Sequence, residues 1–323
     1  MIWLSWRQHR TITLISSALL VAFAALILST GLPILRLYQD VVARCGSGPG
    51  FAAGVARDCN MAFGQVQANY QPPEIMFTAI SILAPFILAI LIAAPLVARE
   101  FEQHTFQLIW TQSATRRQWL LTLVGTIIGG GVVVALVLSL LISWWRVTPD
   151  SFSTRMAPMV FDIEGIAPLG YMIFALMAGI TAGAYLRRIV PAIAVTLISV
   201  IVVRVGFAVL RYIVMPPLRY SFDFLQKTSA SDSSFIAMSG AWNMGNGYMD
   251  HARNTVSYNA IDSACSSRQD YLQCLHDHGW LFYQLYEPAS RFWSMQTIEF
   301  GGFLLLTVIL FAATYWRIVR HPG

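Results

Sequence analysis

The residues that carry chemistry in most enzymes are few in this chain and do not form a catalytic pattern. A phosphate-binding loop of the G-x-x-x-x-G-K-[ST] type needs a lysine, and the only lysine, Lys227, follows Gln226 rather than a glycine. The chain contains neither the H-E-x-x-H helix of zinc proteases nor the G-x-S-x-G turn that exposes a nucleophilic serine. We therefore expect no catalytic residue, no bound cofactor and no ATPase site in this chain.

Three consecutive polar residues, His276, Asp277 and His278, come closest to a metal site. Histidines two positions apart do not share one helical face, so a helix would not aim both at one ion. We therefore favour a polar turn between Cys274 and Trp280, and we expect no metal ion.

The composition of the chain indicates a membrane protein. Of the 323 residues, 56% are hydrophobic and 11% are charged, whereas soluble domains have about 25% charged residues. Apolar runs of the roughly 20 residues that cross a bilayer occur six times. We place these runs near 11–32, 77–98, 119–143, 166–186, 189–210 and 297–316. The sequence therefore predicts an all-α integral membrane protein with six transmembrane helices.

The distribution of arginine gives these spans a direction. With the N-terminus in the cytoplasm, the inner segments carry nine arginines and only two acidic residues, Glu100 and Glu102. The outer segments carry eleven basic and fourteen acidic residues. This asymmetry fits the positive-inside rule. We therefore expect both termini to be cytoplasmic, and the net charge of +5 requires no nucleic-acid partner.

The topology leaves three segments outside the membrane. The longest, residues 211–296, is polar and large enough for a small extracellular domain between the fifth and sixth spans. We therefore divide the chain into 1–210, 211–296 and 297–323. The other two outer segments are 33–76 and 144–165.

All four cysteines fall in these outer segments, where disulfides persist. Neither pair of neighbours has the C-x-x-C spacing of a zinc site. Four cysteines allow three pairings, and the most parsimonious joins Cys45 to Cys59 and Cys265 to Cys274, each within one segment. A disulfide that closes a loop of about 15 residues stabilises the fold by roughly 3 kcal/mol in the chain-entropy model.

The inner segment after the second span has the pattern of an amphipathic helix. Phe101, Thr105 and Leu108 recur at helical spacing, and the acids of its first turn suit the positive end of the helix dipole. Ser113 or Thr115 is placed to cap the next helix. Physical reasoning alone leaves two interpretations open: a helix that presses on a cytoplasmic partner, or a simple interfacial helix.

The same stretch resembles the loop between the second and third spans of type-2 permeases in the ATP-binding-cassette (ABC) exporter superfamily. Those loops read as an acid, then Gly-Thr, an apolar helix, a turn with proline and a downstream arginine. Two positions depart from that pattern, because His104 replaces the usual glycine and Gln112 the usual proline. The positions that match in order and spacing are Glu102, Thr105, Leu108 and Arg116 or Arg117.

Two further segments resemble actinobacterial permeases of this class. One is the opening Met-Ile-Trp-Leu-Ser-Trp-Arg-Gln-His-Arg, and the other is Glu287-Pro-Ala-Ser-Arg-Phe-Trp293, followed by Glu299. The order of six spans and the large outer segment before the last span also fit. The resemblance thus covers essentially the whole chain.

The resemblance implies a permease subunit of the bacterial plasma membrane that pairs with a second copy or a close paralogue. Two separate ABC ATPase subunits would bind ATP and Mg²⁺, and their closure would move the second and fifth spans. Residues 99–110 would be the coupling helix seated on the ATPase, and the helix with Trp3 and Trp6 would lie along the inner membrane surface. The residues assigned to coupling are Glu100, Glu102, His104, Thr105, Leu108, Arg116 and Arg117.

Arg204 lies well inside the fifth apolar run, where a charged side chain costs at least about 2.5 kcal/mol. Either it lines the path and meets an anionic part of the cargo, or it extends to the outer surface near Arg211 and Arg219. The second interpretation is slightly favoured. The residues assigned to the possible substrate path are Phe86, Thr196, Ser199 and Arg204.

The predicted function is therefore that of an exporter permease for an amphipathic or lipid-like molecule, such as an antibiotic. One alternative is an ATPase-driven mechanical relay that acts on an extracellular partner through 211–296 and moves no cargo. A membrane or outer-surface enzyme would need converging acids, histidines or cysteines, which the sequence does not show. An auxiliary membrane subunit without transport is a further alternative.

Overall fold

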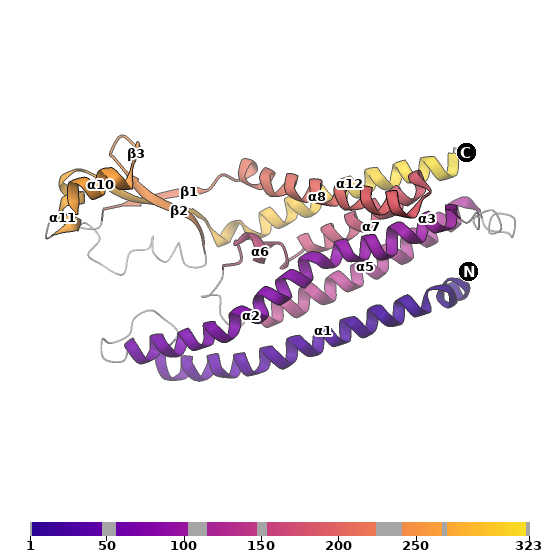
Figure 1. Cartoon of the computed structure of the whole chain (residues 1–323), viewed down its shortest axis with the longest axis horizontal. Coiled ribbons are helices and arrows are strands. Elements are labelled where there is room, and N and C mark those ends of the chain that lie inside the picture. Colours follow the sequence, from indigo (N-terminus) through magenta and orange to yellow (C-terminus); the bar gives the residue numbers. More distant parts are fainter. Residues whose placement is uncertain are drawn as a thin grey trace. The chain divides into compact units, whose positions relative to one another are not determined.

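The computed structural model divides the chain into two units, whose helices and strands are drawn in Figure 1. The helical unit comprises Met1–Phe152, Asp162–Arg204 and Thr297–Gly323, and the β unit comprises Ser153–Phe161 and Val205–Gln296. The residues that the structure describes are 2–46, 56–102, 115–146, 154–223, 241–266 and 270–320.

Within those ranges, six helices are long and apolar enough to cross a membrane. This confirms the number of spans that the sequence predicts. Two of the six end in a π-helical segment or contain one. In chain order the spans are α1 (Ile2–Cys45), α2 (Ala56–Leu88) with η1 (Ala89–Ala93) and α3 (Ala94–Glu102), α5 (Arg116–Arg146), α7 (Ala167–Leu186), α8 (Ile189–Val214), and α12 (Phe292–Tyr315) with η3 (Trp316–Arg320).

The first two spans are much longer than the apolar runs that predict them. α1 has 44 residues, or about 66 Å at 1.5 Å per residue, whereas the hydrocarbon core is about 30 Å thick. The expected outer loop, 33–76, is instead helical as far as Cys45 and again from Ala56. α1 and α2 contact each other, and Val41 and Val66 in these extensions are buried. Pairing of the two helices therefore continues beyond the stretch that hydropathy marks.

Both of these long helices contain prolines. Pro72 and Pro73 lie inside α2, and Pro33 lies inside α1. A proline inside a helix removes one backbone hydrogen bond and costs about 3 kcal/mol or more, so contacts elsewhere along these helices must offset that cost. The helix at the N-terminus is likewise continuous with the first span from Ile2.

α7 is the most enclosed of the spans, and it contacts η1, α3 and α5. The glycines of α7 allow its backbone to lie close to the backbone of α3. A Cβ added at Gly183 would lie 2.9 Å from the carbonyl oxygen of Ala94 and 3.0 Å from the backbone nitrogen of Ala98. The backbones of α7 and α3 are therefore as close as glycine permits, as in helix pairs built on small residues.

The β unit departs from the all-α expectation because it contains a four-stranded antiparallel sheet. The strand order is β1-β4-β2-β3, with β1 at Leu218–Phe222, β2 at Trp242–Met249, β3 at Thr255–Val256 and β4 at Leu281–Glu287. The strands are short and half-buried. Their aromatic residues therefore gave no clear alternating pattern that would have predicted strands from the sequence. The remaining elements are α6 (Pro158–Phe161), α10 (Tyr258–Cys265), α11 (Tyr271–Asp277) and η2 (Ala289–Arg291).

The boundaries of the β unit differ from the expected 211–296. The unit begins at Val205, inside α8, and it also includes 153–161. Because α8 and α12 each continue from one unit into the other, helix ends do not mark these boundaries.

Two disulfides join Cys45 to Cys59 and Cys265 to Cys274, the pairing within each segment that the sequence favours. The first links the end of α1 to the start of α2. The second links α10 to α11, and it is buried with Ile261 of α10.

Candidate functional site

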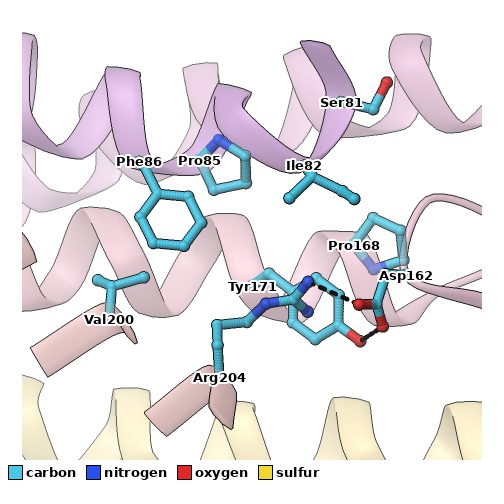
Figure 2. A pocket seen from close by; sticks show the side chains of 9 residues that line it. All are labelled: Ser81, Ile82, Pro85, Phe86, Asp162, Pro168, Tyr171, Val200 and Arg204. Atoms are coloured by element: carbon cyan, nitrogen blue, oxygen red, sulfur yellow. Dashed lines mark hydrogen bonds and ion pairs between the residues drawn. The ribbon is translucent and has the colours of Figure 1, made fainter. Parts of the chain in front are cut away.

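A small pocket in the helical unit lies among α2, α7 and α8 (Figure 2). Its cavity volume is about 10 Å³, roughly the room that one water molecule needs. Three polar side chains, Asp162, Tyr171 and Arg204, meet on one side of it, as Figure 2 shows. The apolar side chains that complete the wall are Ile82, Pro85, Phe86, Pro168 and Val200.

Arg204 turns toward this pocket. Its Nη2 donates a hydrogen bond of 3.1 Å to Oδ2 of Asp162, and its Cζ lies 3.6 Å from the centroid of the Tyr171 ring. The side chains of Arg204 and Asp162 are 14% and 22% exposed. The favoured expectation that Arg204 extends to the outer surface is therefore wrong for this structure. A buried guanidinium needs an anionic partner, and that partner lies 42 residues earlier in the chain.

Tyr171 connects this ion pair to the last span. Its hydroxyl donates a hydrogen bond of 2.7 Å to Oε1 of Glu299 and lies 3.4 Å from Oδ1 of Asp162. A phenol has one proton to donate, so the shorter contact identifies Glu299 as its principal acceptor. Glu299 is buried near the start of α12. Two carboxylates and one guanidinium thus contact the same tyrosine.

The structure brings together only half of the residues expected to line a substrate path. Phe86 and Arg204 line the pocket. Thr196 is buried, but its hydroxyl donates to the carbonyl oxygen of Ala192 at 2.7 Å, and the hydroxyl of Ser199 donates to the carbonyl oxygen of Thr196 at 2.9 Å. Both hydroxyls therefore bond to the backbone of α8, as helical serine and threonine often do.

A second buried ion cluster lies in the same unit. Nη1 of Arg146, at the end of α5, lies 3.2 Å from Oε1 of Glu74 in α2. Nε of Arg146 lies 3.3 Å from Oε2 of Glu164, in the turn before α7. Ser139 of α5 also donates to the carbonyl oxygen of Gly165 at 2.9 Å. Polar contacts therefore join the turn before α7 directly to α5 and α8, and Arg146 of α5 links it in turn to α2.

The residues expected to couple to an ATPase are only partly described. Oε2 of Glu102, at the end of α3, accepts a hydrogen bond of 3.4 Å from the backbone nitrogen of Ile189, the first residue of α8. Glu100 is half-buried in α3. Arg116 and Arg117 form the first turn of α5. The expected contacts of His104, Thr105 and Leu108 lie outside the described residues.

Thr115 caps the start of α5. Its Oγ1 accepts from the backbone nitrogen of Gln118 at 3.2 Å, and Oε1 of Gln118 accepts from the backbone nitrogen of Thr115 at 3.3 Å. This reciprocal pair is a capping box, and Thr115 is one of the two caps that the sequence predicts. The helix that follows the proposed coupling segment therefore has a fixed start.

The β unit uses its chemically active side chains for local structure. Nδ1 of His276 lies 2.5 Å from Oδ2 of Asp223, whereas the ring of His278 stacks on Trp280 at 4.6 Å. His278 also lies near Cys265 and Cys274, but a disulfide leaves no thiolate to bind a metal. Hydrogen bonds from Asn254 hold the pKa of the exposed Asp250 below its usual value.

The sequence did not predict several residues of the two ion clusters as site residues. Asp162, Glu164 and Arg146 were counted as charges of outer segments, because they lie outside the apolar runs. Glu299 is the third residue of the sixth apolar run, and this placement was the signal that the sequence offered. Tyr171 gave no signal, because a single tyrosine is ordinary in a transmembrane helix.

One comparison with known proteins supports a family. A family model described as "ABC-2 membrane transporter related" matches residues 17–211, well over half of the chain. This range includes α2, α7, Arg204 and the turn that holds Asp162. Neither the curated proteins nor the solved structures contain a match to this chain.

Proposed function

We propose that this chain, which belongs to the ABC-2 membrane transporter related family, is the permease subunit of an ABC exporter. It is a multi-pass membrane protein, and as a membrane component of an ABC transporter it works with a separate ABC ATPase. The cargo that we propose is an amphipathic or lipid-like molecule, moved outward across a bacterial plasma membrane.

The pocket is the observation that carries this proposal. It lies among three candidate membrane spans, and its wall combines apolar side chains with the ion pair of Arg204 and Asp162. Pockets that bind small molecules are mostly apolar, with a few placed polar groups that set specificity. Such a wall suits a molecule with an apolar body and a polar end.

The contact of Glu102 with Ile189 supports a route from the ATPase to this pocket. Residues 99–110 are the proposed coupling helix, and Glu102 contacts the start of α8. Arg204 lies 15 residues further along the same helix, or about 22 Å at 1.5 Å per residue. A displacement of the coupling helix would therefore pass along α8 to the ion pair.

The proposed assembly contains two permease chains and two ATPase chains, with ATP and Mg²⁺ bound by the ATPases. Both termini of the permease would be cytoplasmic, and the β unit would be extracellular. Native mass spectrometry of the purified complex measures the stoichiometry. Labelling of single cysteines from each side of sealed vesicles, in a background without the native cysteines, measures the orientation.

Reconstitution with the ATPase tests the function directly. The full chain and an ABC ATPase that co-purifies with it are placed in proteoliposomes loaded with candidate amphipathic molecules. We expect cargo movement that requires ATP, and we expect Glu102→Arg to abolish it while the permease stays inserted and folded. Full cargo-stimulated ATP hydrolysis by the Glu102→Arg complex would contradict the assignment of the coupling helix.

A mechanical relay remains the second candidate, and one observation favours it. The chain returns from the β unit to the helical unit at Asp162 and passes to the β unit again directly after Arg204, so the ion pair joins the residues at two of these crossings. Movement of α8 would therefore reach the β unit as well as the pocket. ATP hydrolysis without cargo movement in the same vesicles would favour the relay.

A further inference from the structure

α8 is the least buried of the six candidate spans. In its most apolar stretch 11% of the residues are buried, against at least 22% in each of the other five. Its buried residues are Ala192, Thr196 and Val200. Arg204 continues this series at the same spacing of four, whereas the next position, Ala208, is exposed. Residues four positions apart lie on one face of a helix, so α8 packs through one narrow row of side chains that ends at Arg204.

The first three members of this row hold α8 without directional bonds to a neighbouring helix. Ala192 packs in a cluster of buried alanines from α3 and α7. The hydroxyl of Thr196 donates to the carbonyl oxygen of Ala192, within α8 itself. Val200 lines the pocket, and Figure 2 shows that it extends from α8 toward the pocket, as Arg204 does. Apolar contacts are non-directional, so they resist a tilt of α8 less than a bond of fixed geometry does.

Arg204 is the member of the row that fixes α8 by directional contacts. Its guanidinium donates to Asp162 at 3.1 Å and stacks on the ring of Tyr171 in α7 at 3.6 Å. The turn that holds Asp162 is itself fixed to α5, where Nε of Arg146 lies 3.3 Å from Oε2 of Glu164. The side chain of Arg204 therefore ties the far end of α8 to α5 and α7.

Burial decides which of these two ion pairs opens more easily. The side chains of Arg146 and Glu164 are 5% and 4% exposed, whereas those of Arg204 and Asp162 are 14% and 22% exposed. Separation of a pair leaves two charges that need solvation, and this costs most where water has least access. A movement of α8 would therefore break its own tie before it moved the turn away from α5.

We propose that Arg204 is a releasable latch on α8. The latch is closed while Arg204 contacts Asp162 and Tyr171, and it opens when α8 tilts about its alanine contacts near Ala192. This inference rests on the proposed function, because it names the step that regulates access to the pocket. The two positions considered for Arg204 from the sequence then correspond to the two states: inside the pocket when closed, and extended toward the outer surface when open.

The opposite end of α8 connects this latch to the proposed coupling segment. Glu102 accepts from the backbone nitrogen of Ile189, the first residue of α8, and Arg204 lies 15 residues further along the helix. A helix is stiff over this length, so a displacement at Ile189 becomes a tilt that acts on the latch. ATP binding shifts the latch only if the ATPase contacts its open and closed states differently.

The reactivity of a buried thiol measures how often the latch opens. All four native cysteines form disulfides, so Val200→Cys introduces the single free thiol of the chain, at a position that is 3% exposed. The purified full chain in dodecyl maltoside is reacted with a water-soluble maleimide, and mass spectrometry gives the labelling rate, which reports local opening. Ala135→Cys is a second reporter, also at a 3% exposed position but on α5, and it detects general loosening of the helical unit.

Removal of the guanidinium should open the latch. Arg204→Met should raise the labelling rate of Val200→Cys about tenfold or more, because a hydrogen bond to a charged group favours the closed state by about that factor. The labelling rate of Ala135→Cys should stay the same. Arg204→Lys keeps a charge for Asp162 but loses the planar group that stacks on Tyr171, so its rate should lie between those of the wild type and Arg204→Met.

A matched control and the ATPase complex complete the test. Val202→Met changes a side chain of α8 that is 62% exposed and outside the buried row, and it should leave the labelling rate of Val200→Cys unchanged. In the complex with the ATPase, ATP should raise that rate. Arg204→Met should make the rate high without ATP and insensitive to it.

Four results have opposite meanings. An unchanged rate in Arg204→Met would overturn the inference, and so would an equal rise for Ala135→Cys, because Arg204 would then stabilise the whole helical unit. If Arg204→Met does not give a monodisperse protein, Arg204→Lys replaces it, and a rate no higher than that of the wild type would count against the latch. A complex that hydrolyses ATP without any change in the labelling rate would contradict the release of the latch. ATP-dependent labelling without cargo movement would instead contradict the proposed function and leave the latch in place.

Discussion

Replacement of Arg146 by methionine should destabilise the helical unit strongly. Arg146 is 5% exposed, and it lies within 3.3 Å of two carboxylates on other parts of the fold, Glu74 and Glu164. Methionine has a similar length and no charge. The substitution would therefore leave Glu164, which is 4% exposed, without this ion pair in a region of low dielectric constant.

The expected magnitude follows from the burial of the partners. Removal of one member of a buried ion pair costs about 3–5 kcal/mol, because the remaining charge stays buried. Glu164→Gln should cost less, roughly 1–3 kcal/mol, since Arg146 keeps its contact with Glu74 at 3.2 Å. Joint replacement of Arg146 and Glu164 by methionine should cost less than Arg146→Met alone, because no uncompensated charge remains between them.

Unfolding in mixed micelles with increasing SDS measures these differences, followed by the loss of helical circular dichroism. Arg44→Met is the matched control, because Arg44 also forms an ion pair, with Asp40, but the two side chains are 64% and 60% exposed. Exposed pairs contribute about 0–1 kcal/mol. An Arg146→Met variant no less stable than the Arg44→Met variant would refute the reasoning, as would strict additivity in the double variant.

Three further changes test other parts of the fold. Gly183→Ala would place a Cβ 2.9 Å from the carbonyl oxygen of Ala94 and should cost about 1–3 kcal/mol of stability. Gly129→Ala, where a Cβ would meet nothing within 4 Å, should be neutral or slightly stabilising; equal midpoints in thermal unfolding would contradict the close packing of α7 on α3. Reduction of Cys265–Cys274 should lower the stability of the β unit by about 2–4 kcal/mol, seen as faster amide exchange in α10 and α11; unchanged exchange would contradict it. Glu102→Gln keeps an acceptor for the backbone nitrogen of Ile189 but loses the charge. If coupling depends on the contact with α8, ATP-driven transport by this variant should exceed that of Glu102→Arg, whereas equal loss in both would indicate that the charge on the ATPase side matters.

The sequence by itself determined the membrane character of the protein and the number of its spans. Both follow from local hydropathy, because about 20 apolar residues in a row have few stable places outside a bilayer. The cysteine pairs of the structure are the most parsimonious of the three pairings that the sequence allowed, since each pair is close along the chain. Thr115 was one of the two caps that the sequence offered, and the structure completes it with Gln118, three residues away.

Only the tertiary structure decided what the charged residues do. Asp162 and Arg204 lie in different segments that only the fold brings within 3.1 Å, and Glu299 reaches the same cluster through Tyr171 from the last span. The extension of α1 and α2 beyond their apolar runs depends equally on contact between the two helices. A buried charge is stable only beside its partner, and partners far apart in sequence leave no periodic pattern. The sequence could therefore identify Arg204 as unusual, but only the fold could show that it occupies a pocket.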